Sequence, residues 1–215
     1  MIRVMAPKHR PGWQFLAPAL VLLAAFVVPA VLLLAGRGAP AFQSVDTAWQ
    51  SVALGWHTPF WDGVNAVLNL AGYTGALIVH ALLAVALLMR RRPKTAVFVL
   101  ASGLSVLALT QLAKTVVGRE RPQGAHVLTD TGSYPSGHVS ATTALLAVVA
   151  LLMARWWMNL VAVAGVLAMM LSRTYLSAHW LSDVFGGACL AGGVVFLLWW
   201  RFRDICIKEN ALPGQ

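Results

Sequence analysis

The chain has 215 residues, of which 59% are hydrophobic and 11% are charged, and its mean hydropathy is +0.74. Soluble domains contain about 25% charged residues, so this composition excludes a soluble globular domain and predicts an integral membrane protein. The formal net charge of +9 does not call for a nucleic-acid partner, because basic residues near the ends of membrane spans account for it.

Predominantly apolar stretches follow one another along the whole chain. A helix needs about 20 such residues to cross a bilayer, and the fourth and fifth stretches are shorter than that. None shows the alternating pattern of a membrane barrel. We therefore expect an all-α bundle of six transmembrane helices, and the short loops predict a single domain over residues 1–215. The predicted spans are 13–35, 64–89, 95–113, 139–154, 157–171 and 183–200.

The first stretch has some features of a signal peptide. Lys8 and Arg10 precede it, and Ala39-Pro40-Ala41 resembles a cleavage site. However, it is longer than the roughly 7 to 15 residues of a signal-peptide core. We expect an uncleaved membrane anchor.

The segment between the first two spans, 36–63, leaves two structures open. Either an amphipathic helix lies on the outer leaflet, or an irregular loop is anchored there by aromatic side chains. The apolar residues at helical spacing are Val45, Ala48, Trp49, Val52 and Trp56.

The basic residues predict the orientation, because Lys and Arg are retained on the cytoplasmic side of a membrane. Both termini are therefore expected to be cytoplasmic. Eleven of the 16 basic residues share the cytoplasmic face: Arg3, Lys8, Arg10, Arg90, Arg91, Arg92, Lys94, Arg155, Arg201, Arg203 and Lys208. The other face carries Arg37, Lys114, Arg119, Arg121 and Arg173, balanced by Asp46, Asp62, Glu120, Asp130 and Asp183.

Three cations from separate segments meet at this outer face: Lys114, Arg121 and Arg173. They would repel one another unless an anion lay between them. A phosphoryl group carries a charge of about −1.5 to −2, and the Arg fork matches its geometry. Each cation alone would more often be a lipid-headgroup anchor. Together they indicate a phosphate site.

A polar tetrapeptide, PSGH, begins the fourth span at the same face. Ser136 is a favourable N-cap, and Gly137 allows a ligand to approach the backbone closely. The N-terminus of a helix is an anion site, and His138 is placed to give a proton to a leaving group. On its own, the tetrapeptide could be only a cap and a turn.

His179 and Asp183 are four residues apart. If the sixth helix begins near Ala178, they share a face and touch. A carboxylate that holds one imidazole nitrogen leaves the other as a nucleophile or base. The alternative is an interfacial histidine beside a capping aspartate, but three cations and a second histidine nearby favour catalysis. Cys189 and Cys206 offer neither a disulfide nor metal-ligand spacing, so no metal or cofactor is expected.

These residues form three motifs. Lys114 is followed after six residues by Arg121-Pro122. The PSGH tetrapeptide comes next, and Ser172-Arg173 is followed after five residues by His179 and after three more by Asp183. Together they resemble the signature of the type 2 phosphatidic acid phosphatase superfamily, with every fixed position present in the right order. The six-span layout resembles its bacterial integral-membrane branch, which includes phosphatidylglycerophosphatase B-like and polyprenyl diphosphatase enzymes.

The resemblance implies a role for each residue. His179 would attack phosphorus and become a phosphohistidine, Asp183 would orient it, and His138 would protonate the leaving oxygen and later activate water. Arg119 would only support the site, and no metal would be needed. The phosphoryl oxygens would be held by Lys114, Arg121, Ser136, Gly137 and Arg173.

The expected function is that of a metal-independent lipid phosphatase in the bacterial cell membrane, with its site facing away from the cytoplasm. Our first expectation for the substrate is undecaprenyl or another polyprenyl diphosphate. Phosphatidylglycerophosphate or phosphatidate is the alternative, and a protein that binds or transports phospholipid without hydrolysing it is a further one. Vanadium haloperoxidases share these motifs, so vanadate should inhibit. A neutral His179 and a protonated His138 predict a bell-shaped pH profile.

Overall fold

The computed structural model describes residues 13–36, 40–124 and 132–211, and these contain helices and no strand. The predicted all-α class is therefore confirmed. The charges at Arg3, Lys8, Arg10, Arg37 and Asp130, and Ala39 of the cleavage-like sequence, lie outside the described residues. The elements are α1 (Trp13–Ala35), α2 (Gln43–Leu54), α3 (Pro59–Leu70), the π-helical turn η1 (Ala71–Gly75), α4 (Ala76–Met89), α5 (Pro93–Val117), α6 (Gly137–Met153), α7 (Trp156–Tyr175) and α8 (Leu181–Ala211).

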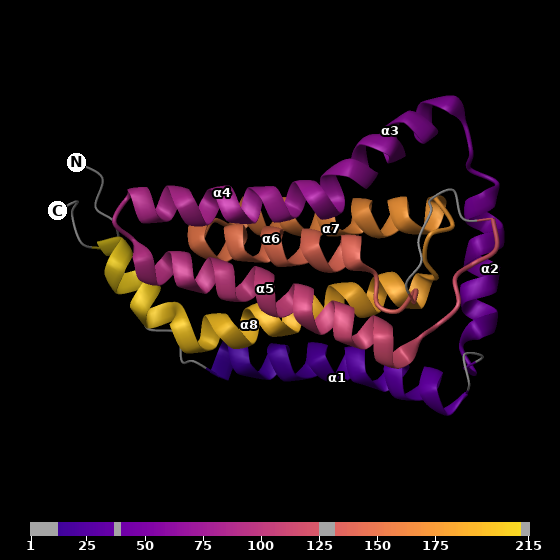
Figure 1. Cartoon of the computed structure of the whole chain (residues 1–215), viewed down its shortest axis with the longest axis horizontal. Helices are drawn as coiled ribbons and strands as arrows, with labels where there is room; N and C mark the ends of the chain where they lie inside the picture. The colour runs from indigo at the N-terminus through magenta and orange to yellow at the C-terminus, as the bar shows by residue number, and fades with distance from the viewer. Residues whose placement is uncertain (1–12, 37–39, 125–131, 212–215) are drawn as a thin grey trace.

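The helices that can cross a membrane form one elongated bundle (Figure 1). Five helical stretches of the described chain are long and apolar enough: Trp13–Ala35, Pro59–Met89, Pro93–Val117, Trp156–Tyr175 and Leu181–Glu209. The shorter apolar helix Gly137–Met153 lies among them. This is the predicted six-helix bundle. The start of α1 and the end of α8 lie at the same end of it.

The long helix α8 packs against α1, α5 and α6 in the core. Small residues allow the close approach, as is common between membrane helices. A Cβ at Gly193 would lie only 2.7 Å from Cγ of Leu23 on α1. α8 also contributes Leu190, Val195 and Trp199 to a buried apolar cluster with Phe98 of α5.

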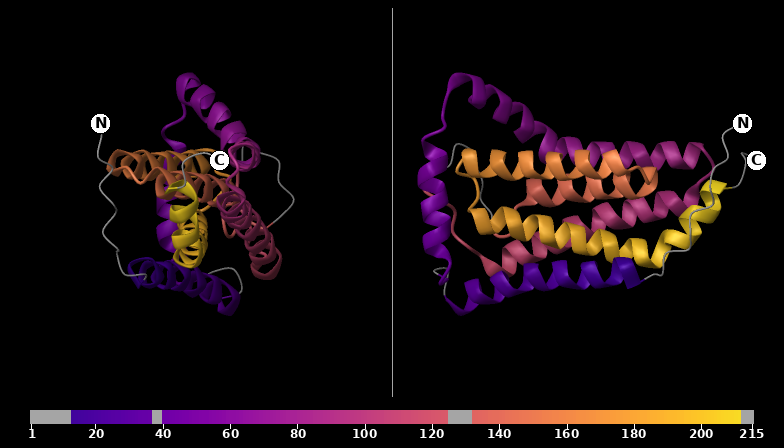
Figure 2. Two further views of the ribbon diagram at one scale, coloured as in Figure 1. Left: turned by 90° about the vertical axis from the view of Figure 1, so that its left-hand side faces the viewer. Right: turned by 180° about the vertical axis from the view of Figure 1, so that it is seen from behind.

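The segment 36–63 contains a helix, so the irregular loop is wrong for residues 43–54. α2 lies across the end of the bundle, roughly perpendicular to the other helices (Figures 1 and 2). α3 then begins at Pro59, before the predicted 64, because Thr58 caps it by accepting a hydrogen bond from the Trp61 amide at 3.3 Å. α3 diverges from the bundle where η1 interrupts the α-helix, and such π-helical turns are a known cause of kinks.

Candidate active site

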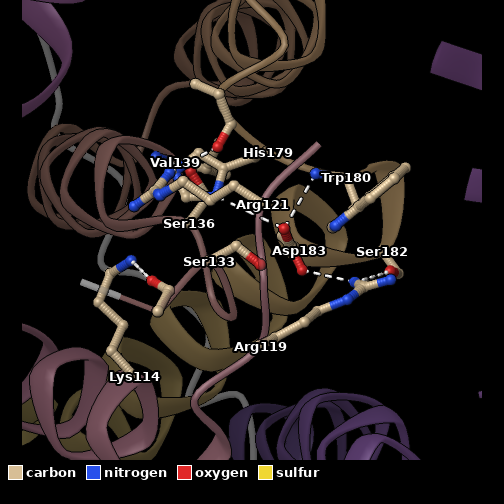
Figure 3. Close-up of polar contacts among 12 residues, drawn as sticks. Lys114, Arg119, Arg121, Ser133, Ser136, Val139, His179, Trp180, Ser182 and Asp183 are labelled. Atoms are coloured by element: carbon tan, nitrogen blue, oxygen red, sulfur yellow. Dashed lines mark hydrogen bonds and ion pairs between the residues drawn. The ribbon is translucent and has the colours of Figure 1, made fainter. Parts of the chain in front are cut away.

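The elements that carry the predicted site residues meet at the end of the bundle that α2 covers (Figure 1). Figure 3 shows five of these residues: Lys114, Arg121, Ser136, His179 and Asp183. Lys114 comes from the last turn of α5, and Arg121 from the loop after it. Arg173 comes from the last turn of α7 and Asp183 from the first turn of α8. Ser136 caps α6, whose first residues are Gly137 and His138, and His179 lies in the turn between α7 and α8. Residues predicted from three separate motifs therefore share one site.

His179 is placed differently from the expectation. The last helix begins at Leu181 and not near Ala178, because Ser177 adopts a positive φ of 49° and the Ala178 amide turns back to the Arg173 carbonyl at 3.1 Å. The contact with Asp183 survives, since Nδ1 of His179 lies 3.6 Å from Oδ2 of Asp183. This is within ion-pair range but longer than a hydrogen bond.

The two ring nitrogens of His179 have different neighbours. Nδ1 faces the Asp183 carboxylate, whereas Nε2 lies 3.4 Å from Nη1 of Arg121, a donor. These neighbours favour the tautomer with its proton on Nδ1 and a lone pair on Nε2. Burial lowers the pKa of His179 to about 4 and outweighs the nearby Asp183 carboxylate, which raises it; Lys114 and Arg121 lower it further. Near neutral pH, His179 is therefore an uncharged imidazole whose unprotonated Nε2 faces Arg121.

Asp183 is fully buried and held from two sides. Its Oδ1 accepts a hydrogen bond from Nη1 of Arg119 at 2.6 Å, and its Oδ2 accepts one from the Trp180 amide at 2.9 Å. Nη2 of Arg119 in turn donates to Oδ2 of Asp46 on α2 at 2.7 Å. Arg119 therefore contacts the predicted orienting carboxylate directly, which is more than the supporting role expected of it.

The PSGH turn is built as predicted. Ser136 is buried and is the N-cap of α6, where its hydroxyl accepts from the Val139 amide at 3.5 Å. Its own amide donates to the Asp183 carbonyl at 3.0 Å, which ties this turn to α8. The preceding Tyr134-Pro135 bond is cis. A Cβ at Gly137 would make ordinary contact with Tyr73 at 3.4 Å, so packing alone does not require glycine there.

His138 and Arg173 share a partner that sequence reasoning missed. Nε2 of His138 lies 3.1 Å from the backbone oxygen of Asn69, and Nη1 of Arg173 donates to the side-chain oxygen Oδ1 of Asn69 at 2.7 Å. Asn69 lies near the end of α3, in a different segment from all three motifs. Its only sequence signal is a polar residue within an apolar span.

Two of the cations are buried beside neutral oxygens. Lys114 and Arg173 are 6% and 1% exposed. Nζ of Lys114 donates to the Gly132 carbonyl at 2.6 Å, and Arg173 donates to Asn69 and, at 3.3 Å, to Oγ of Ser172. Neither cation pairs with a carboxylate in the part of the chain that the structure describes. Buried charge without a counterion is costly, so the site is suited to an anion.

Two hollows of opposite character flank this site. A polar pocket of about 370 Å³ lies against Arg121 and Trp180 under α2. An apolar groove of about 480 Å³ runs between α3 and α7, where Tyr175 of α7 holds the start of α3 by donating to Oδ1 of Asp62 at 2.7 Å. The groove is lined by Trp56, Trp61, Val64, Asn65, Leu68, Ala168, Leu171, Ser172 and Tyr175.

Comparison with known proteins agrees with the motifs. The family model of the PAP2 superfamily matches residues 94–205, while none of the curated proteins matches the chain. A similar solved structure is described as the first transmembrane PAP2 type phosphatidylglycerolphosphate phosphatase from Bacillus subtilis. It is 21% identical, with a TM-score of 0.74, over 92% of this chain and 98% of that one, so the two share a fold. The chain therefore belongs to the PAP2 superfamily, as an integral membrane member.

Proposed function

We propose that this protein is a metal-independent lipid phosphatase that works through a phosphohistidine at His179. One observation carries the proposal. Two buried cations, Lys114 and Arg173, have no carboxylate partner among the described residues, and they belong to the same site as a buried histidine with an unprotonated Nε2. Family membership and the membrane-spanning helices support a phosphatase that acts on lipids.

The chemistry follows from the two histidines. Nε2 of His179 attacks phosphorus, and the bond from phosphorus to the leaving oxygen breaks with its electron pair on that oxygen. His138 gives this oxygen a proton and releases the dephosphorylated lipid. His138 then takes a proton from water, the hydroxide attacks the phosphohistidine, and inorganic phosphate leaves with His179 restored.

Fixed positive charge stabilises the transferring group. In this mechanism Lys114, Arg121 and Arg173 bind the equatorial oxygens, and the Ser136 hydroxyl and the Gly137 amide add donors at the start of α6. Donors that are already in place cost no reorganisation during the reaction. Asp183 keeps the Nδ1 proton of His179 in place and stabilises the positive charge that develops on the ring.

The hollows beside the site suit an amphiphile. The polar pocket receives the headgroup, and the apolar groove between α3 and α7 receives a hydrocarbon chain. Ser172 lines that groove and also accepts a hydrogen bond from Arg173, so chain and phosphate lie next to each other. We propose polyprenyl diphosphate as the substrate, because its single hydrocarbon chain matches this groove, whereas a diacyl phospholipid carries two chains. Phosphatidylglycerophosphate is the alternative, which the name of the Bacillus subtilis relative favours.

The charges support a site that faces away from the cytoplasm. Basic residues at the ends of α4, α6 and α8 cluster at the end of the bundle opposite the site. By the positive-inside rule, that end is cytoplasmic and the site is at the outer leaflet of the bacterial cell membrane.

The test is phosphate release by the purified protein in excess chelator. Polyprenyl diphosphate, phosphatidylglycerophosphate and phosphatidate are compared, with His179→Ala as the control. We expect release by the wild type that His179→Ala loses, fastest with polyprenyl diphosphate. Fastest release from phosphatidylglycerophosphate would support the alternative substrate. Binding of these lipids without release would support a transport or binding role.

A further inference from the structure

A row of buried charges runs from α2 into the proposed site. Asp46, in the first turn of α2, is 2% exposed, and Arg119 is 3% exposed. Arg119 joins Asp46 at 2.7 Å to Asp183 at 2.6 Å, one carboxylate on each terminal nitrogen. Asp183 then lies 3.6 Å from His179. Negative and positive side chains thus alternate up to the imidazole.

Asp46 also holds the start of α8. Its Oδ1 accepts from the Ser182 amide at 2.8 Å, and its Oδ2 accepts from the Ser182 hydroxyl at 2.6 Å. The next residue is Asp183, so α2 fixes the helical turn that carries it. Gln43, at the start of α2, adds a third contact by accepting from Nη2 of Arg119 at 2.7 Å.

Aromatic rings enclose the guanidinium between these carboxylates. Cζ of Arg119 lies 5.4 Å from the ring centre of Trp180 and 5.9 Å from that of Phe42. A cation over an aromatic face is attracted to it. The planar fork and its stacking are properties that lysine does not share. Arg119 is therefore fixed in both position and orientation.

We propose that Asp46 and Arg119 are positioning residues that hold Asp183 in place behind His179, so that α2 completes the active site. The inference rests on the proposed function, in which His179 is the nucleophile. Asp46 lies outside residues 94–205, the part matched by the family model. A buried carboxylate needs a partner, and partners of this kind orient the groups that act on substrate.

The row predicts how the His179 ring responds to each change. The groups that interact electrostatically with this ring are Asp183 on α8, Lys114 on α5, Arg121 in the loop after α5 and His138 on α6. Arg173 of α7 interacts in the same way with His138 and Arg121. Asp46→Asn leaves all of these in place and removes one negative charge behind Arg119. The full charge of Arg119 then acts on Asp183, so the carboxylate attracts a proton on His179 less strongly.

The experiment separates geometry from charge. Asp46→Asn and Arg119→Lys are compared with the wild type on whichever of the three lipids it hydrolyses fastest. NMR of labelled histidine measures the pH midpoint of His179 protonation. The matched controls are Asp204→Asn and Arg201→Lys, at exposed positions near the other end of α8. In both test variants we expect kcat to fall about 10- to 100-fold, the range for outer partners of ligating side chains, with KM little changed. The midpoint should move to lower pH in Asp46→Asn and stay in place in Arg119→Lys.

Wild-type kcat in both variants, or an unmoved midpoint in Asp46→Asn, would overturn the inference. Failure of both variants to fold would overturn it equally, because the pair would then only stabilise the fold. The proposed function fails separately, if His179→Ala releases phosphate as the wild type does.

Discussion

His179 lies in the turn between α7 and α8, where burial and the charges around it set its protonation. A nucleophilic imidazole must be unprotonated on the attacking nitrogen. The Nε2 atom meets this need at neutral pH because burial favours the uncharged ring. In the proposed mechanism, Asp183 is near enough to stabilise the positive charge that the ring gains as phosphorus is attacked.

The protonation of His179 gives a direct prediction. Its pKa is lowered to about 4, so the ring stays neutral as the pH falls through 6.5 and gains a proton only near pH 4. NMR titration of labelled histidine, with His179→Gln to identify the signal, measures this. A midpoint near 6.5, the value of an exposed imidazole, would contradict it. The bell-shaped rate profile stays a prediction, which the rate of phosphate release over pH 4 to 9 would test.

The three motifs located every residue of the proposed phosphate site, because the chemistry restricts both residue types and spacing. They did not locate Asn69 or Asp46. Each contacts the site through tertiary packing of α3 or α2, and neither stands at a fixed spacing from a motif. A contact between residues 104 apart, as between Asn69 and Arg173, leaves no local pattern in the sequence.

At the scale of elements, the site depends on close packing between α8 and the PSGH turn. A Cβ at Gly187 would lie 2.7 Å from the backbone oxygen of Ser136. A backbone atom cannot move aside as the end of a flexible side chain can, so the turn or the helix must shift.

Gly187→Ala is therefore expected to lower the melting temperature and to reduce phosphate release at least 10-fold, since a displacement of about 1 Å at a site is this costly. Gly63→Ala on α3 is the control, because a Cβ there meets nothing within 4 Å. Wild-type melting and activity in Gly187→Ala would show that the contact does not constrain the site.

The groove between α3 and α7 gives a second prediction at this scale. Ala168→Trp would fill the groove that Ala168 lines. We expect KM for a long-chain substrate to rise about 10-fold, which corresponds to losing the burial of roughly two methylene groups, while kcat stays near the wild-type value. Val163→Trp is the control, because Val163 on α7 is 59% exposed and does not line the groove. An equal effect of both substitutions would contradict a role for the groove.

For the whole molecule, the apolar spans were predictable because bilayer thickness sets their length and composition. The residues at which the spans begin and end were less predictable. α8 continues to Ala211, beyond the predicted 200, because the helix extends into a polar segment that an apolarity criterion excludes. α2 remained undecided because it is a short helix of 12 residues with mixed polarity. Its position over the site depends on buried pairs such as that of Asp46 with Arg119.

The orientation of the whole bundle is testable in intact cells. Thr47→Cys on the exposed side of α2 and Arg201→Cys near the far end of α8 are labelled with a membrane-impermeant maleimide. The native Cys189 and Cys206 are buried. We expect Thr47→Cys to react from outside and Arg201→Cys to react only after the cells are opened. The opposite pattern would place the site in the cytoplasm.

The most direct test of the central claim is to trap the phosphorylated enzyme. Purified protein in excess chelator is mixed with a lipid phosphate substrate, quenched in base to preserve phosphohistidine, and analysed by mass spectrometry, with His179→Ala alongside. A phosphoryl group on His179 of the wild type, and none in the variant, is the predicted result. Phosphate release from the wild type with the phosphoryl group on another residue, or undiminished release by His179→Ala, would contradict it.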